Sequence, residues 1–445
     1  MTYDIAVELI AAGQHHRALI SLCVAARRFA TLNDWEQACA GAEGDAAQKA
    51  RTIQFRDCLD RDSPLPANAN VFDPLALLVA LDEFLFENEW GQHLHRAAPL
   101  ELGGNSYWLT KAPLATRPSG SLARQAANLT RWLKHHTVIP VRVDDQFDIV
   151  LSRTHSHADR VLLKIATTPE PHVEAFIAHF DDGADVKWSR DPTGGNWTTL
   201  HIEPADARAA SIQSQLARAL QDKATFWLAP EFTLDPALRQ VCRDTLEAEP
   251  AHELAFVVPA SFHEAINGKK WNIAPVWDGA GTELFEHRKL KLFGDEEHGA
   301  EAISLGSTLR VLDTPIGLVA ACICKDFMDI AGGMAALRDA IPVDWWLVVS
   351  YGDASTHRAH LATAKSIAKL HPGAHCLVAH TLNTALPDDR APGKDGPLPG
   401  FVVTPSADVQ NVAKHGSQFA IPLIFKAKAS PTTPGSRASR LKVAK

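Results

Sequence analysis

The sequence predicts an α/β protein, with a layered α/β domain in its C-terminal half and a mainly helical region with a small β element before it. From about residue 197 onward, short apolar runs typical of strands alternate with amphipathic helical segments. Several of these runs are apolar throughout, as strands are when both faces of a sheet are covered. A chain of 445 residues is long enough for about two or three domains.

The domain boundaries follow changes in the apolar pattern along the chain. Residues 1–136 carry apolar side chains at helical spacing and are expected to form a helical region. Residues 137–195 contain short runs rich in Val, Ile and Leu, then a stretch dense in Asp, Gly and Pro, which predicts a small α+β segment and a linker. The layered domain is expected over 196–425, followed by a basic flexible tail over 426–445.

The charge pattern limits the expected partners and location of the protein. The formal net charge is −8, and because residues 426–445 hold six Lys or Arg and no acid, the remainder carries −14. Binding of nucleic acid is therefore not expected, except through the basic tail. No apolar run reaches the roughly 18 residues of a membrane span, and no basic segment with a long apolar run begins the chain. We expect a cytoplasmic protein without membrane contact.

Cysteine and histidine patterns give no sign of a disulfide framework, a metal or a cofactor. The seven cysteines are odd in number and form no CxxC pair, so most are expected to be reduced and buried. The 21 histidines include no HExxH, and the glycine pairs fit neither GxGxxG nor GxxxxGK[ST]. We expect neither a metal site nor a nucleotide cofactor.

Three predicted strands in the C-terminal half finish close to a reactive residue. TFWLAPEF ends at Glu231, EHRKLKLF carries Lys289 near the end of a hairpin strand, and GLVAACICKDF places Cys324 where an apolar strand stops. Catalytic groups collect at strand ends in open α/β sheets. A thiol at its free pKa is a weak nucleophile, so it needs a carboxylate to take its proton and a cation to hold the anion. Taken singly, each residue suits an ordinary loop or core position; together the three predict one catalytic site.

The order and wording of these motifs, APEF, HRKLKLF and ICKD, resemble the carbon–nitrogen hydrolase (nitrilase) superfamily over about residues 197–425. The resemblance implies an αββα sandwich and a catalytic triad of Glu231, Lys289 and Cys324 that works through a thioester. It also implies a homo-oligomer. Many members keep a second Glu about eight residues after the Lys, and Glu297 matches that offset.

Four residues are expected to position the substrate: Glu297, Lys325, Ser350 and Tyr351. Lys325 follows the predicted nucleophile where the family has Tyr, Trp, Glu, Asn or Asp, which leaves the substrate class open. Ser350 and Tyr351 end the strand DWWLVVSY and are expected at the mouth of the pocket, if the sheet register is like that of the family.

Two functions of different classes are consistent with the sequence. The first is hydrolysis of a non-peptide C–N bond in a small amide or carbamoyl compound. A nitrile is less favoured because the Trp or Glu typical of true nitrilases after the Cys is absent, and acyl transfer to another amine stays open. The second is a regulatory or scaffold protein that binds a partner through residues 1–195, where nothing resembles the family.

Overall fold

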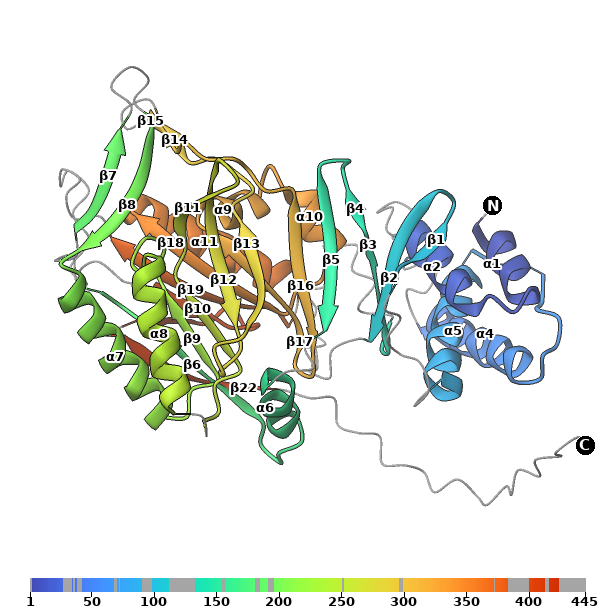
Figure 1. Cartoon of the computed structure of the whole chain (residues 1–445). Coiled ribbons are helices and arrows are strands. Elements are labelled where there is room, and N and C mark those ends of the chain that lie inside the picture. The colour runs from blue at the N-terminus through green and yellow to red at the C-terminus, as the bar shows by residue number, and fades with distance from the viewer. Residues whose placement is uncertain are drawn as a thin grey trace, which may run out of the picture.

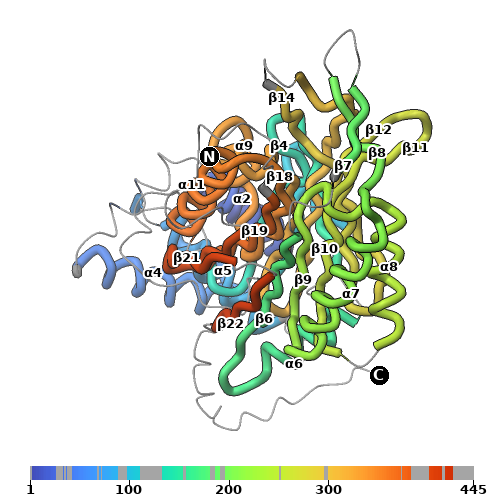
Figure 2. Tube along the Cα trace, turned by 90° about the vertical axis from the view of Figure 1, so that its left-hand side faces the viewer, coloured from blue at the N-terminus to red at the C-terminus, as the bar shows by residue number. Residues whose placement is uncertain are grey.

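Two β-sheets packed face to face, with helices on both outer sides, form the body of the molecule in this computed structural model (Figure 2). The structure describes residues 2–26, 34, 37, 42–67, 70–71, 73–89, 98–111, 133–153, 157–180, 185–190, 196–249, 252–295, 299–371, 373–382, 400–412 and 416–423. The predicted tail, 426–445, lies outside these ranges.

The first sheet has seven strands and contains the strand that leads to Glu231. Its order is β11 (Phe262–Ile266), β12 (Lys269–Trp277), β10 (Phe256–Pro259), β9 (Phe226–Ala229), β6 (His172–Ile177) and β22 (Ser417–Pro422), with β13 (Glu283–Arg288) paired to β12. Strands β6, β9 and β10 are parallel. Every residue of β9 and β10 is buried, which agrees with the continuous apolar runs that predict strands covered on both faces.

The second sheet has eight strands and leads to Cys324. Its order is β21 (Val409–Asn411), β20 (Gly400–Val403), β19 (His375–Leu382), β18 (Trp345–Gly352), β17 (Gly317–Ile323), β16 (Thr308–Thr314), β5 (Phe147–Arg153) and β4 (Arg142–Val143). The central strands β17, β18 and β19 run parallel, so their carboxyl ends lie at one edge.

The outer layers are helical. Helices α7 (Ala205–Gln221) and α8 (Pro236–Ala248) share a core with the outer face of the first sheet, and α9 (Lys325–Ile330), α10 (Ala335–Ala340) and α11 (Ala354–Leu370) share one with the second. A third core joins the sheets, where the rings of Phe226 and Trp345 lie 5.3 Å apart. The predicted αββα sandwich is confirmed.

The strand pairing differs from the expected separate segment at 137–195. Strand β5 pairs in parallel with β16 and antiparallel with β4, and β6 pairs in parallel with β9 and antiparallel with β22, so this segment supplies β6 to the first sheet and β4 and β5 to the second. Helix α6 (His157–Ala166) connects them and packs against the core between the sheets. Part of the expected linker is strand β7 (Asp185–Arg190), which forms a hairpin with β8 (Trp197–Glu203).

The N-terminal region is mainly helical, as expected, and lies at one end of the molecule (Figure 1). Helices α1 (Thr2–Ala11), α2 (His15–Ala26), α4 (Ala42–Asp60) and α5 (Asp73–Glu89) share a separate apolar core. Strands β1 (Leu100–Leu102), β2 (Asn105–Lys111) and β3 (His136–Pro140) form a small sheet, so the hairpin of β1 and β2 falls within residues 1–136, which were expected to be mainly helical. No helix of the described residues is both long and apolar enough to cross a membrane.

Polar contacts join this region to the sandwich. The indole N–H of Trp108 donates to the carbonyl of Ile149 at 3.0 Å, and the hydroxyl of Thr110 donates to the carboxylate of Asp313. Arg153 lies 3.3 Å from the same carboxylate. The small sheet is therefore held against strands β5 and β16.

Candidate active site

Glu231 follows strand β9 and lies buried, only 1% exposed, at the edge where the parallel strands end. Its Oε1 accepts hydrogen bonds from Nδ2 of Asn272 at 2.9 Å and from Nζ of Lys289 at 3.2 Å. Its Oε2 accepts from the backbone N–H of Tyr351 at 3.0 Å. Both oxygens are thus fixed by donors from other strands, and the carboxylate has one defined orientation.

Lys289 directly follows strand β13, and its ammonium is shared between two carboxylates. Nζ lies 3.2 Å from Oε1 of Glu231 and 2.7 Å from Oε2 of Glu301. Burial alone would lower the pKa of Lys289, but the charges of the two carboxylates outweigh it and raise this pKa above its ordinary value. The side chain therefore remains a fixed positive charge.

Glu301 is the closer partner of Lys289, and other groups hold it in place. Its Oε1 accepts from Nε2 of His263 at 3.2 Å and from Nδ2 of Asn272 at 3.2 Å. The backbone N–H of Thr199 donates to Nδ1 of His263 at 2.9 Å, so the ring hydrogen is on the Nε2 that faces Glu301. Burial raises the pKa of Glu301, but the charge of Lys289 and the His263 hydrogen bond bring it down to about 2.

The two carboxylates differ in protonation behaviour because of these partners. Burial raises the pKa of Glu231 to about 7; the charge of Lys289 opposes this rise, and the charge of Glu301 adds to it. Two acids whose pKa values are pushed apart take different roles. Glu231 can gain and lose a proton near neutral pH, whereas Glu301 remains an anion beside the ammonium.

Cys324 lies between strand β17 and helix α9 in a strained backbone conformation, with φ 43° and ψ −101°. Its N–H donates to the carbonyl of Val349 at 2.9 Å, and its Sγ lies 3.7 Å from the carbonyl of Tyr351. Non-glycine residues at positive φ are uncommon and cluster at functional sites. Tyr351 thus contacts Cys324 through its carbonyl and Glu231 through its N–H.

The thiol of Cys324 needs a base. Burial and the charge of Glu231 raise its pKa to about 12, while the charge of Lys289 and the hydroxyl of Ser350 oppose the rise. At neutral pH the sulfur is therefore protonated, and a thiolate forms only when a neighbouring group takes the proton.

Asp326 ties the Cys324 helix to the chain after Lys289. Its Oδ1 accepts from the backbone N–H groups of Leu290 at 2.9 Å and Lys291 at 2.8 Å, and its Oδ2 lies 2.9 Å from Nε2 of His287. This buried carboxylate therefore links α9, a helix of six residues, to the end of the hairpin strand β13 and the residues after it.

The residues predicted to position substrate have different environments. Glu297 lies outside the described residues, and Glu301, twelve positions after Lys289, is the second carboxylate on that ammonium. Strands β14 (Gly294–Asp295) and β15 (Gly299–Ala300) pair with each other and lie between Lys289 and Glu301 in the chain, which lengthens the connection between these two residues. Lys325 is partly exposed, and its ammonium pairs with Asp329 at 2.8 Å.

Ser350 and Tyr351 both lie beside Cys324 but differ in exposure. Ser350 is fully buried. The ring of Tyr351 is half-buried, and its centroid lies 5.7 Å from that of Phe232 and 5.8 Å from that of Trp188 on strand β7. These three rings form an aromatic group beside Glu231.

Sequence reasoning missed Asn272, His263 and Glu301. Asn272 was detectable in principle, because it is the polar residue within the otherwise apolar run WNIAPVW. His263 and Glu301 meet only because strand β11 and the segment after β15 converge, and no local pattern indicates that contact.

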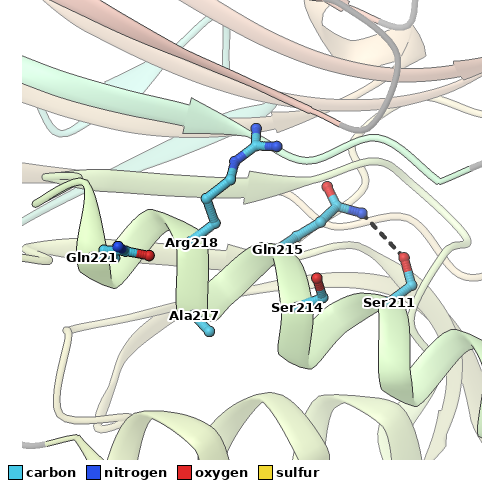
Figure 3. A pocket seen from close by; sticks show the side chains of 6 residues that line it. All are labelled: Ser211, Ser214, Gln215, Ala217, Arg218 and Gln221. Carbon is cyan, nitrogen blue, oxygen red and sulfur yellow. Dashed lines mark hydrogen bonds between the residues drawn. The ribbon is translucent and has the colours of Figure 1, made fainter.

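The structure also has a hollow of about 540 Å³ along helix α7 (Figure 3). It is lined by Ser211, Ser214, Gln215, Ala217, Arg218 and Gln221. Gln215 exchanges hydrogen bonds with the backbone N–H and carbonyl of His179, and Arg218 donates to the carbonyl of Gly416 at 2.9 Å. Its lining contains no thiol or carboxylate, and these contacts indicate a structural role.

Comparisons with known proteins give matches only among solved structures. No family model and no curated protein matches the chain. Nit3 of Saccharomyces cerevisiae, a member of branch 10 of the nitrilase superfamily, is 15% identical over 57% of this chain and 90% of its own, with a TM-score of 0.40. A cysteine-to-serine mutant of an amidase from Nesterenkonia AN1, from the same superfamily, is 15% identical over 57% of this chain and 91% of its own, also with a TM-score of 0.40. Both come from the superfamily that the sequence motifs resemble.

The described residues include no group of three or more His, Cys, Asp or Glu side chains placed to hold a metal ion.

Proposed function

We propose that this chain hydrolyses a C–N bond in a small amide or carbamoyl compound, with Cys324 as nucleophile, Glu231 as proton carrier and Lys289 as the fixed cation. One observation carries the proposal. A buried ammonium is shared by two carboxylates, and one of these, Glu231, is joined through Tyr351 to a buried thiol. Burial raises the pKa of this carboxylate to about 7. A general base works best when its pKa is close to the operating pH.

In the first half-reaction, the Glu231 carboxylate takes the thiol proton and the sulfur of Cys324 attacks the carbonyl carbon. The electron pair that moves onto oxygen is stabilised by the Lys289 ammonium and the backbone N–H of Lys325. When this oxyanion collapses, the C–N bond breaks and the leaving nitrogen takes the proton from Glu231. Ammonia or an amine departs, and a thioester remains on the sulfur.

In the second half-reaction, Glu231 takes a proton from water while the water oxygen attacks the thioester carbon. Collapse breaks the C–S bond, and the sulfur takes the proton back from Glu231, which releases a carboxylic acid and restores the starting state. Transfer of the acyl group to an amine in place of water would use the same thioester, so the nature of the acceptor distinguishes hydrolase from transferase.

Substrate positioning is assigned to the groups around the sulfur. The half-buried ring of Tyr351, with Phe232 and Trp188, offers an aromatic face to the part of the substrate that does not react. Lys325 lies next to the sulfur in sequence and contributes its backbone N–H. Glu297 remains a prediction from the sequence alone.

The proposal is tested by replacing the three residues and measuring ammonia or amine release from a panel of amides, carbamoyl compounds and nitriles. Cys324→Ala, Glu231→Gln and Lys289→Met are each expected to lower kcat by about 10³-fold or more, because the groups act as one unit. Mass spectrometry should detect an acyl adduct on Cys324 in the wild-type protein during turnover.

Cys322→Ala is the matched control, since Cys322 is a buried thiol two residues away on strand β17. This variant should keep its activity. The proposal is wrong if Cys324→Ala, with thermal unfolding like that of the wild-type protein, releases ammonia at the wild-type rate.

A further inference from the structure

A buried cluster of Ser350, His360 and His380 lies close to Cys324, and the proposed reaction does not use it. The three side chains come from β18, α11 and β19, and each is fully buried. Oγ of Ser350 lies 2.7 Å from Nε2 of His360 and 3.0 Å from Nδ1 of His380. The parallel register pairs Ile323 with Val349, Cys324 and Ser350 are the next residues along the two segments, and the N–H of Cys324 donates to the carbonyl of Val349 at 2.9 Å.

Both imidazole rings are uncharged at neutral pH. Burial lowers the pKa of His360 to about 3, and the charges of His357, Lys289 and Lys325 contribute to the decrease. Burial also places the pKa of His380 well below its ordinary value, with His360 and His357 acting in the same direction and Asp353 opposing them. Each imidazole ring therefore carries one N–H hydrogen, on either Nδ1 or Nε2.

The number of N–H hydrogens on the two rings limits which way the serine hydroxyl can point. Nδ1 of His360 and Nε2 of His380 are buried and make no hydrogen bond within the described residues. A ring hydrogen on Nδ1 of His360 would be a buried donor without an acceptor, which costs free energy, whereas one on Nε2 of His380 would have only the nearby backbone carbonyl of Asp353 as its acceptor. With the hydrogens on the nitrogens that face Ser350, both rings donate to Oγ, which has two lone pairs. The one hydroxyl hydrogen must then go to another acceptor.

We propose that Ser350 donates this hydrogen to Sγ of Cys324, and that His360 and His380 fix its direction. Ser350 is then a positioning residue that stabilises the thiolate, supplementing Lys289. The hydroxyl of Ser350 does oppose the rise of the thiol pKa caused by burial. Hydrogen bonds to ionised acceptors are roughly twice as strong as those between neutral groups. The inference rests on the proposed function only in taking Cys324 as the nucleophile.

A competing arrangement makes a different prediction. The backbone carbonyl of Asp353 lies near His380 and could attract a hydrogen on its Nε2. Ser350 would then donate to Nδ1 of His380, and its removal would leave the thiolate of Cys324 unchanged.

The rate of alkylation of Cys324 by iodoacetamide, followed by mass spectrometry of the peptide that contains it, separates the two arrangements. The rate follows the thiolate fraction. Ser350→Ala should therefore lower the rate at a fixed pH of about 8 by roughly tenfold, which corresponds to a rise of about one unit in the thiol pKa. Ser350→Thr keeps the hydroxyl and should restore most of the rate.

Thr381→Val is the matched control. Thr381 lies on β19 opposite Tyr351, and its buried Oγ1 makes no hydrogen bond within the described residues. This variant should alkylate like the wild-type protein. Equal rates for Ser350→Ala and wild type would overturn the proposal, and so would a Cys324 no more reactive than the neighbouring buried Cys322. Alkylation does not require turnover of an amide, so the two proposals can fail separately. If only the proposed function is wrong, no ammonia is released, but Ser350→Ala still alkylates more slowly than the wild-type protein.

Discussion

At the scale of single residues, the site depends on the charge balance around one buried ammonium. Lys289 and Glu301 neutralise each other, so Glu231 is the group whose ionisation changes the net charge of the cluster. When Glu231 is protonated the cluster is neutral, and when it is ionised the cluster carries one negative charge in a buried environment. Burying an uncompensated charge is costly, which explains why Glu231 holds its proton up to a pKa of about 7.

This balance predicts a pH profile. Because Glu231 must be ionised to accept the thiol proton, kcat/KM should rise with pH and level off above an apparent pKa of about 7. The raised pKa of Lys289 keeps its ammonium charged, so this side chain should cause no loss of rate in alkaline solution. In Glu301→Gln, the charge of Glu301 no longer raises the pKa of Glu231, and the ammonium of Lys289 pairs with Glu231 alone. The acid limb should therefore move to lower pH.

The profile of kcat/KM against pH, measured with the best amide substrate, checks both statements. Glu286→Gln is a suitable control, because this partly exposed carboxylate of strand β13 pairs with Arg288 and does not contact Lys289. Its acid limb should match that of the wild-type protein. An unshifted limb in Glu301→Gln would show that Glu301 does not control the proton affinity of Glu231.

At the scale of elements, the short helix α9 depends on the buried carboxylate of Asp326. A helix of six residues is not stable by itself. Asp326→Ala should leave the backbone N–H groups of Leu290 and Lys291 and the ring of His287 without their acceptor. The expected loss of unfolding free energy is about 3 kcal/mol, and kcat should fall because Cys324 and Lys289 lose their mutual alignment.

Urea denaturation of the variant, together with its kcat, measures this effect. Asp329→Ala, on the same helix, removes only a partly exposed ion pair with Lys325 and should cost less than about 1 kcal/mol. Comparable losses in the two variants would count against Asp326 as the link between α9 and the hairpin.

The parts of the site that the sequence predicts are those that depend on local pattern. Glu231 and Cys324 each follow an apolar strand, and Lys289 follows a hairpin strand, so each position can be recognised from the residues around it. Glu301 could not be found from its distance to Lys289, because a small hairpin lengthens the connection. The contact between Ser350 and His380 depends on the register of two strands, which no local pattern determines.

The same reason explains the differences in the fold. The helix–strand alternation after residue 197 predicts the layered sandwich, whereas the strand runs before it could not be assigned to a sheet. Strands β5 and β6 find their partners β16 and β9 far along the chain. Pairing over such distances is decided by how whole sheets fit together.

At the scale of the whole molecule, the N-terminal region adds a separate core to the edge of the sandwich near strand β5 (Figure 1). All the residues assigned above to the site come from later segments, so we expect this region to act through assembly or binding. A homo-oligomer, a protein partner of residues 1–195 and a cytoplasmic location remain predictions from the sequence. The regulatory alternative would gain support if Cys324 proved unreactive while the helical region still bound a partner.

Trp108 offers a direct test of how firmly the N-terminal region is attached. Its half-buried ring packs against the core on the outer side of the second sheet, and its indole N–H donates to Ile149. Trp108→Ala should weaken the attachment by about 2–3 kcal/mol, so that the helical region unfolds at a lower temperature than the sandwich. Trp108→Phe keeps most of the packing and should cost only about 1 kcal/mol. Differential scanning calorimetry should then resolve two transitions for the Ala variant, with kcat preserved below the first.

Trp271→Ala is the control, because it removes an indole stacked on Arg288 in the sandwich and should shift the sandwich transition instead. A single transition shifted as a whole in Trp108→Ala would mean that the two cores unfold as one unit.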